Sequence, residues 1–285
     1  MEALPFAIGP MAEKLKGHDV VLVVGAPVFR YYPYVPGKYL PDGMRLIHIT
    51  DDPSEAARAP VGDATLGDAA LACAALAGTV PDSGRALPAP RVAMPAPEPT
   101  TPMTPDFLFY ALAQARPGNV VLVQESPSNM KPLHAHLPAT RPASYFSMAS
   151  GGLGFGLPTA IGIALAERHT GRNRPVIAVI GDGSFQYAVQ SLHTAARHDL
   201  PLLVVVPDNH EYAILKSFAA QEGTPNVPGL DLPGLDLVAI AQGFGCAARR
   251  VERPEEVTAA AREALASGKP TVLQVSITSE VPPLL

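Results

Sequence analysis

Short apolar runs alternate with amphipathic stretches along the chain and predict strands that alternate with helices. The runs that predict strands are Val20–Val24, Leu46–Thr50, Val120–Gln124, Val176–Ile180, Leu202–Val206, Cys246–Val251 and Thr271–Ile277. The stretches that predict helices are Met11–Lys16, Asp68–Ala77, Pro105–Ala115, Leu157–His169, Phe185–His198, Leu235–Gln242 and one that begins at Pro254. Because continuous apolar runs indicate strands buried on both faces, the pattern predicts an α/β fold with a parallel sheet and helices on both faces.

Proline marks the predicted boundary between two domains. Prolines recur through residues 81–105 among Ala, Ser and Thr, a composition typical of an extended linker. We expect a small first domain at 1–80, a linker at 81–103 and a larger domain at 104–285. In the first domain Gly25 follows a strand and could mark a nucleotide-binding turn, but the sequence has no Gly-x-Gly-x-x-Gly pattern there and continues with a poor helix start.

Polar residues follow two neighbouring apolar strands of the larger domain. Gly181–Ser184, with the sequence Gly-Asp-Gly-Ser, follows one strand, and Asp208–Asn209 follows the next. A right-handed crossover makes two such strands parallel, so we expect Asp182 to lie close to Asn209 at one edge of the sheet. Gly-Asp-Gly alone is also a common turn at the end of a core strand. The second polar strand end favours a functional site instead.

The residue types of these clusters suit a divalent cation and a diphosphate. Mg²⁺ prefers oxygen ligands in near-octahedral geometry at roughly 2.1 Å and commonly keeps phosphate and water among them. Asp182 offers a carboxylate, Asn209 an amide oxygen and Glu211 its main-chain carbonyl. The two glycines let the backbone approach a phosphate, and Ser184 is expected to open the following helix, whose N-terminus favours an anion.

Gly-Asp-Gly followed in the next strand by an Asn-containing pair is the signature of thiamine-diphosphate-dependent enzymes. The chain also resembles benzoylformate decarboxylase and its close relatives at Gly25–Arg30, Ser150–Pro158 and Asn226–Asp231. The resemblance runs through nearly the whole chain. It implies thiamine diphosphate and magnesium as cofactors, and a thiamine-diphosphate-binding fold preceded by a partial Rossmann-like middle domain.

The same resemblance implies roles for individual residues. The implied metal ligands are Asp182, Asn209 and the main-chain carbonyl of Glu211. The implied cofactor-binding residues are Ser128, Gly151, Gly152, Leu153, Gly181, Gly183, Ser184 and Tyr212. In the family the carbonyl at Gly151 accepts a hydrogen bond from the aminopyrimidine, and the bulky residue at Leu153 keeps the cofactor bent. A glycine-rich turn needed only for close packing is the alternative for this segment.

Five positions differ from the family pattern or bear on the substrate. Asp208 stands where the family usually has the first Asn of the pair, which adds a negative charge beside the metal. Tyr32 occupies the place of a histidine that helps benzoylformate decarboxylase transfer protons, and a phenol with a reference pKa near 10 is a poor acid-base group at neutral pH. Ser147 replaces an aromatic pocket residue and Ile214 a small one, while Phe218 could line the substrate pocket or belong to the core.

The resemblance also implies that the chain is incomplete as an enzyme. The family activates its cofactor with a Glu from an N-terminal pyrimidine-binding domain, donated across a dimer interface, and no part of this chain resembles that domain. We expect a truncated protein, a proteolytic fragment or one subunit of a split enzyme, inactive alone. The intact enzyme is expected to be a dimer or tetramer that converts an aromatic or other 2-oxo acid to an aldehyde and CO₂. The alternatives are a carboligase similar to acetolactate synthase and a non-catalytic cofactor-binding subunit.

Composition narrows the class of protein. With 47% hydrophobic and 16% charged residues the chain is typical of globular proteins, and a net charge of −5 gives no electrostatic footprint for nucleic acid. No run approaches the ~18 apolar residues of a membrane span, and the sequence shows no signal peptide. Cys73 and Cys246 are isolated, which argues against a disulfide framework and fits the cytoplasm. His134 and His136 lack a third metal ligand at a useful spacing, and a flavin is not expected.

Overall fold

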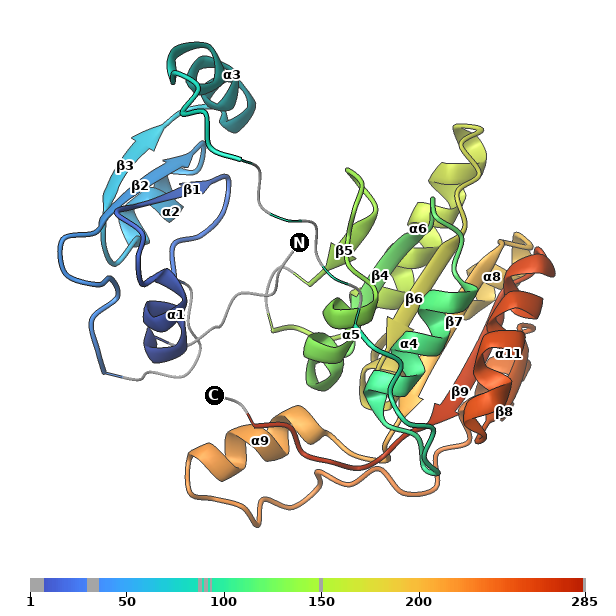
Figure 1. The fold of residues 1–285 in the computed structure, drawn as a ribbon. Helices are drawn as coiled ribbons and strands as arrows, with labels where there is room; N and C mark the ends of the chain where they lie inside the picture. Colours follow the sequence, from blue (N-terminus) through green and yellow to red (C-terminus); the bar gives the residue numbers. More distant parts are fainter. Residues whose placement is uncertain are drawn as a thin grey trace. The chain divides into compact units, whose positions relative to one another are not determined.

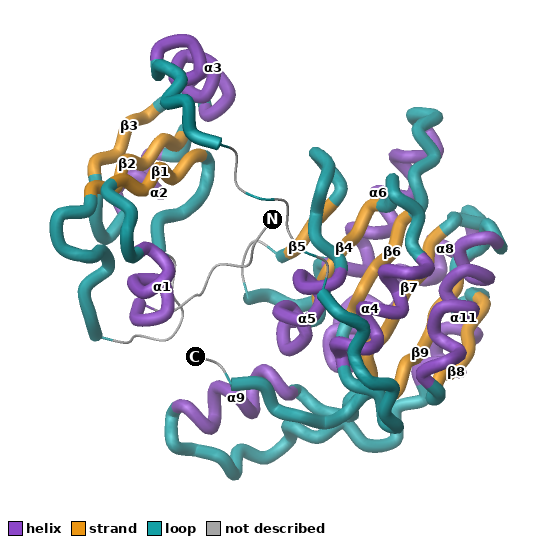
Figure 2. The backbone as a smooth tube through the Cα atoms, in the orientation of Figure 1, coloured by secondary structure: helices purple, strands orange, loops and turns teal. Residues whose placement is uncertain are grey.

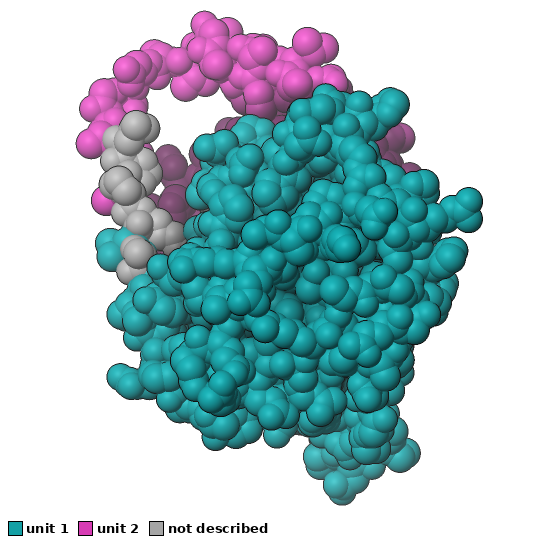
Figure 3. Space-filling model, turned by 90° about the vertical axis from the view of Figure 1, so that its right-hand side faces the viewer, with its two compact units in different colours: residues 1–2, 92–284 teal, residues 3–91, 285 magenta. Residues whose placement is uncertain are grey.

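The chain forms two compact units in a computed structural model that describes residues 8–29, 36–86, 89, 92, 94–148 and 151–283. One unit lies within residues 3–91 and the other within 92–284 (Figure 3). The junction between them falls inside the proline-rich stretch. The domain limits given above stay a prediction.

The first unit is a small parallel sheet with three strands in the order β1-β2-β3 (Figure 1). The strands are β1 Val20–Val24, β2 Arg45–Thr50 and β3 Asp63–Leu66, and the helices are α1 Ile8–Leu15, α2 Pro53–Arg58 and α3 Ala69–Thr79. Asp52 and Asp68 accept hydrogen bonds from the first N–H groups of α2 and α3 and so begin these helices. The apolar pattern predicted neither α2 nor β3, because both are short and neither contains a continuous apolar run.

The second unit is a six-stranded sheet in the order β5-β4-β6-β7-β9-β8 (Figure 2). Its strands are β4 Val121–Glu125, β5 Tyr145–Ser147, β6 Val176–Ile180, β7 Leu202–Asp208, β8 Ala247–Val251 and β9 Thr271–Ser276. Every pair of neighbouring strands is parallel. The predicted α/β fold with a parallel sheet is therefore confirmed.

Alternate residues of the central strands build two cores on opposite faces of this sheet (Figure 1). Ile177 and Val179 of β6 belong to the core that contains residues of α4 Pro105–Ala115, α5 Met130–His136 and α11 Pro254–Ala266. Ala178 and Ile180 belong to the core that contains residues of α6 Gly156–His169, α8 Leu192–Arg197 and α10 Leu237–Gly243. Burial of both strand faces explains why β6 and β7 read as continuous apolar runs.

The continuous helix predicted over 185–198 is wrong. The segment forms α7 Asp182–Phe185, a 3₁₀ stretch at Gln186–Ser191 and then α8. The reason is local, because Ala188 leaves the helical region with φ −142° and ψ 30°. The first turn begins at Asp182 with Gly181 as its N-cap, so Asp182 itself opens the helical segment.

Three further short elements were not predicted from the sequence. They are β5, α5 and α9 Ala213–Gln221. β5 has three residues, and α5 contains Pro132 in its first turn, so neither has a clear apolar period. Across the described residues, no helix combines the length and the apolar character needed to cross a bilayer.

Candidate functional site

The carboxyl ends of β4, β6 and β7 surround a cavity. The chain passes from β4 to β5 on one side and then returns to β6 on the other side, so the strand order reverses between β4 and β6. Ligands of open α/β sheets bind at such a reversal, outside the carboxyl ends of the strands. The cavity is lined by the segments Ser126–Asn129, Gly181–Ser184 and Glu211–Ile214, with Leu153, Pro207 and Asn209.

Asp182 places a buried carboxylate at this cavity. Its side chain belongs to a residue only 3% exposed, and Oδ1 accepts a hydrogen bond of 2.8 Å from the N–H of Gly183. The other oxygen, Oδ2, is buried and has no hydrogen-bond donor within the part of the chain that the structure describes. Burial, and then the nearby carboxylate of Asp208, raise the pKa of Asp182 to about 7. A cation bound beside Asp182 would stabilise the ionised form of this carboxyl group.

Asp208 is a second buried carboxylate beside it, and its hydrogen bonds are made. The Gln274 side-chain amide donates to Asp208 Oδ2 at 2.6 Å. The N–H of His210 donates to Oδ1 at 3.3 Å, and Nδ1 of the exposed His210 ring lies 3.1 Å from the same oxygen. The chain thus holds two carboxylates close together, with donors directed at both oxygens of Asp208 but at only one oxygen of Asp182.

Asn209 and Glu211 continue the wall of the cavity. The amide oxygen of Asn209 accepts a hydrogen bond of 3.3 Å from the N–H of Glu211. The Glu211 carboxylate pairs with Lys216, which also reaches Asp231 at 2.6 Å. Glu211 and Asp231 form an isolated antiparallel bridge, so these contacts fasten the loop before Asp231 to the strand end.

Gly183 has no room for a side chain. A Cβ at this position would lie 2.7 Å from Cδ1 of Tyr212. Burial, Tyr187 and Asp182 raise the pKa of the Tyr212 phenol, so the ring stands in its neutral form against the turn. The backbone of the Gly-Asp-Gly-Ser turn is therefore enclosed by an aromatic ring on one side and open to the cavity on the other.

Comparisons with known proteins agree with this geometry. Residues 128–275 match the family model described as thiamine pyrophosphate enzyme, C-terminal TPP binding domain. The chain belongs to the thiamine pyrophosphate enzyme family. It is 43% identical over 276 residues to benzoylformate decarboxylase of Pseudomonas aeruginosa, covering 95% of this chain and 51% of that protein. It is 31% identical over 175 residues to the acetolactate synthase isozyme 2 large subunit of Escherichia coli, covering 60% of this chain and 31% of that protein.

A solved structure shows the same fold. The crystal structure of benzoylformate decarboxylase from Polynucleobacter necessarius superposes with a TM-score of 0.95 at 40% identity, covering 99% of this chain and 53% of that one. The chain spans about half the length of these benzoylformate decarboxylases. The predicted family and cofactor, thiamine diphosphate, are confirmed.

The residues present fit the cofactor and a cation. The cavity offers a buried carboxylate oxygen without a donor in the described part of the chain, an amide oxygen and a largely buried glycine turn that lines its wall. Among the described residues no group of three His, Cys, Asp or Glu side chains could hold a metal. That finding is compatible with the predicted ligands, because they are one carboxylate, one amide and one main-chain carbonyl.

The structure brings most, but not all, of the predicted site residues together. Those that line the cavity are Ser128, Leu153, Gly181, Asp182, Gly183, Ser184, Asn209, Glu211, Tyr212 and Ile214. Gly151 and Gly152 are exposed and do not line it, although they directly precede Leu153. Ser147 ends the edge strand β5, and Phe218 lies on α9; neither lines the cavity. Tyr32 lies outside the described residues.

Sequence reasoning missed several residues at the site. Ser126 and Asn129 line the cavity, and the Asn129 amide donates to Ser126 Oγ at 2.9 Å. Glu125 is fully buried at the end of β4, one residue before the cavity begins. A signal for it was available, because an acidic residue ends β4 and β7 and another follows β6 two residues after its end.

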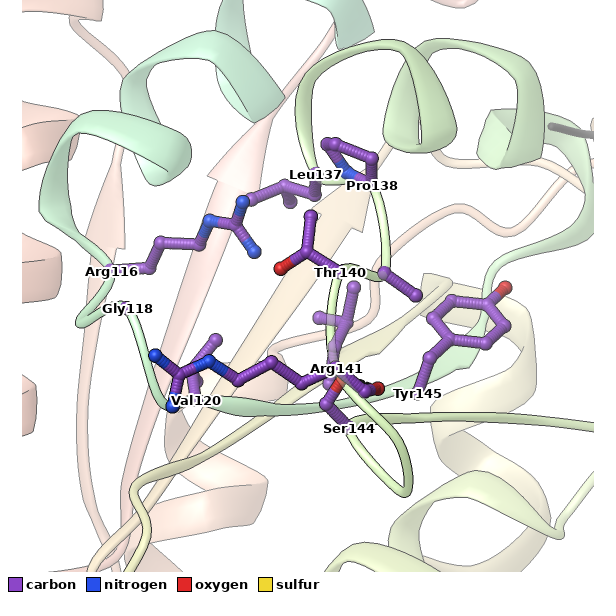
Figure 4. Close-up of a pocket in the computed structure, with 11 residues that line it drawn as sticks. Arg116, Gly118, Val120, Leu137, Pro138, Thr140, Arg141, Ser144 and Tyr145 are labelled. Carbon is purple, nitrogen blue, oxygen red and sulfur yellow. Dashed lines mark hydrogen bonds between the residues drawn. The ribbon is translucent and has the colours of Figure 1, made fainter. Parts of the chain in front are cut away.

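The second unit has another cavity, at the amino ends of β4 and β5 (Figure 4). Arg116, Thr140 and Arg141 point toward it, and no acidic residue lines it. Burial lowers the pKa of the Arg116 guanidinium. This cavity lies at the amino ends of the strands, whereas the candidate site lies at their carboxyl ends. His134 and His136, for which the sequence offers no third metal ligand at a useful spacing, contact Tyr145 and Asp106.

Proposed function

We propose that the chain is the diphosphate-binding part of a thiamine-diphosphate- and magnesium-dependent lyase that decarboxylates a 2-oxo acid to an aldehyde. The observation that carries this proposal is the buried Asp182 oxygen, which has no donor among the described residues and lies in the glycine turn that lines the cavity at the reversal of strand order. The similarity to benzoylformate decarboxylase supports an aromatic 2-oxo acid as the substrate.

The proposed roles follow from the placement of the residues. Asp182, the Asn209 amide oxygen and the main-chain carbonyl of Glu211 would hold Mg²⁺. The residues proposed to hold the diphosphate and the rings of the cofactor are Ser128, Gly151, Gly152, Leu153, Gly181, Gly183, Ser184 and Tyr212. Bound thiamine diphosphate supplies the electron sink for loss of CO₂. The chain supplies binding, orientation and a wall that excludes water.

The residues proposed for the substrate pocket are Ile214, Ser147, Phe218 and Tyr32. Ile214 lines the cavity and would restrict the size of a substrate beside the cofactor. Ser147 and Phe218 would contribute only from outside the cavity, and Tyr32 stays a sequence-based proposal. We propose that the activating Glu belongs to a pyrimidine-binding domain that corresponds to the part of the relatives this chain does not cover. We also propose that the complete enzyme is a cytoplasmic homo-oligomer.

Titration calorimetry of the chain with thiamine diphosphate tests the cofactor part, with and without Mg²⁺. We expect binding that requires Mg²⁺ and is lost in Asp182→Asn, with Asp199→Asn as a control at an exposed position. Metal-independent binding, or equal binding by both variants, would contradict the assignment. The chain alone is expected to show no decarboxylation of benzoylformate, and turnover by the pure chain would refute the need for a further domain.

A carboligase is the second candidate, supported by the similarity to acetolactate synthase. The two activities share a cofactor. After loss of CO₂ a decarboxylase releases an aldehyde, whereas a carboligase forms a carbon–carbon bond to a second carbonyl compound. Product analysis of the enzyme completed with its pyrimidine-binding part would separate them. Benzaldehyde from benzoylformate supports the decarboxylase, whereas acetolactate from pyruvate supports the carboligase.

A further inference from the structure

Glu125 is a carboxyl group with no solvent exposure at the last position of β4. Both of its oxygens accept hydrogen bonds from main-chain N–H groups, one from Gly154 at 2.7 Å and one from Gly156. A buried carboxyl group costs free energy unless such bonds compensate it. Glu125 therefore fixes the glycine turn at 154–156 to the end of β4.

The main chain of the same residue reaches a second turn. The carbonyl oxygen of Glu125 accepts a hydrogen bond of 3.0 Å from the N–H of Gly181, the residue that caps α7. One residue thus contacts both glycine turns, the Gly181–Ser184 turn through its main chain and the 154–156 turn through its side chain.

The fit between Glu125 and the 154–156 turn is tight. A Cβ at Gly156 would lie 2.8 Å from Glu125 Cβ and 2.5 Å from Ile180 Cδ1. Gly154 has a φ of +97°, and a Cβ there would lie 3.1 Å from Tyr187 Cβ. The turn can approach the strand end only because both positions are glycine, so its place is set by contact rather than by a flexible loop.

Leu153 connects this arrangement to the cavity. It directly precedes Gly154 and lines the same cavity as the Gly181–Ser184 turn. We propose that Glu125 is a positioning residue that sets the distance between these two walls for a ligand that spans both. The identity of that ligand, thiamine diphosphate, rests on the proposed function.

The variant Glu125→Gln separates the two contacts of Glu125. It keeps the side-chain volume and the main-chain bond to Gly181, but it turns an NH₂ group toward one of the two N–H donors. The Gly181–Ser184 wall should therefore stay in place while the Leu153 wall loosens. A ligand that touches only the first wall should bind almost normally, and a ligand that touches both should bind more weakly.

Calorimetry with two probes measures this difference. In the presence of Mg²⁺, we expect Glu125→Gln to weaken thiamine diphosphate binding about tenfold or more, since the loss of one charge-assisted hydrogen bond corresponds to roughly a tenfold change in affinity. Inorganic diphosphate binding should weaken by about twofold or less. Glu125→Asp keeps the charge but is too short to reach both turns, so an intermediate loss is expected. An equal loss for both probes, or no loss for either, overturns the proposal.

Glu167→Gln is the matched control. Glu167 is 2% exposed near the far end of α6, where it pairs with Arg174 at 2.6 Å. Its substitution also removes a buried carboxylate, but away from both turns. It should lower the free energy of unfolding and leave the ratio of the two affinities unchanged.

Hydrogen exchange without any ligand distinguishes failure of this inference from failure of the proposed function. Glu125→Gln should raise the exchange rates of the Gly154 and Gly156 amides, while the Gly181 amide keeps its rate. If the unmodified chain binds neither probe, the proposed function of the chain alone fails, and the exchange rates still decide the role of Glu125. Unchanged exchange at Gly154 and Gly156 overturns it.

Discussion

Replacing Asp182 by Asn should stabilise the ligand-free chain, and more so at higher pH. The folded carboxyl has a pKa raised from 3.8 to about 7, because it is buried and lies beside Asp208. Between these values the folded chain holds a proton that the unfolded chain has released. The free energy of unfolding of the unsubstituted chain therefore decreases as pH rises, by about 1.4 kcal/mol per pH unit from this group, and levels off above the folded pKa. Below the unfolded pKa the penalty is absent.

The magnitude follows from the pH interval. Of the interval from pH 5 to pH 8, about two pH units lie below the folded pKa of Asp182. Over that range this group lowers the free energy of unfolding by about 3 kcal/mol. Asn has nearly the same shape and cannot ionise. The free energy of unfolding of the variant minus that of the unsubstituted chain should therefore be larger at pH 8 than at pH 5, by up to about 3 kcal/mol.

Urea unfolding at the two pH values, without divalent cations or cofactor, provides the measurement. Asp199→Asn, at an exposed carboxylate, is the control and should show no such difference between the pH values. If Asp182→Asn changes the free energy of unfolding equally at pH 5 and pH 8, burial does not raise this pKa and the electrostatic reasoning is wrong. A third variant, Asp208→Asn, removes the charge that adds to the pKa shift of Asp182, so the pH dependence should become shallower.

Two further substitutions test the walls of the cavity. Gly183→Ala places a Cβ 2.7 Å from Tyr212 Cδ1, so we expect a loss of about 1–3 kcal/mol in the free energy of unfolding and weaker cofactor binding, measured by urea unfolding and calorimetry. Binding equal to that of the unsubstituted chain would show that the ring can move aside. Lys216→Met keeps the side-chain stem but removes the ion pairs with Glu211 and Asp231, which should cost about 2 kcal/mol because the Glu211 carboxylate is buried. Faster hydrogen exchange across 222–232 should accompany it, and unchanged exchange there would contradict the role of Lys216 in fastening the loop.

Most of the strands could be predicted because their apolar signals are local. β1 and β6 coincide with the predicted apolar runs at both ends, since neither strand contains a polar residue. Asp182 and Asn209 follow from topology, because parallel neighbouring strands must end at the same edge of the sheet. The 3₁₀ break at Ala188 left no such signal, since its sequence is compatible with a helix.

Glu125 could not be recognised as a positioning residue from the sequence. Its partners are the main-chain N–H groups of Gly154 and Gly156, 29 and 31 residues further along the chain. A main-chain donor carries no side-chain signature, and only the folded backbone shows that both donors point at one carboxyl group. Ser147 and Phe218, which the sequence suggested for the substrate pocket, do not line this cavity, and a match of position in sequence does not fix the direction of a side chain.

The three acidic residues that end or closely follow β4, β6 and β7 show how stability and binding are divided at this site. Glu125 is compensated by two main-chain donors and Asp208 by Gln274, so these two can stabilise the frame without a ligand. Asp182 alone among the three keeps an oxygen without a donor in the described part of the chain, and it carries the raised pKa. A cation that binds only the folded chain would remove that penalty and add its own binding free energy to stability. Stabilisation by Mg²⁺ with thiamine diphosphate should therefore be larger at pH 8 than at pH 5, and the pH dependence should vanish in Asp182→Asn.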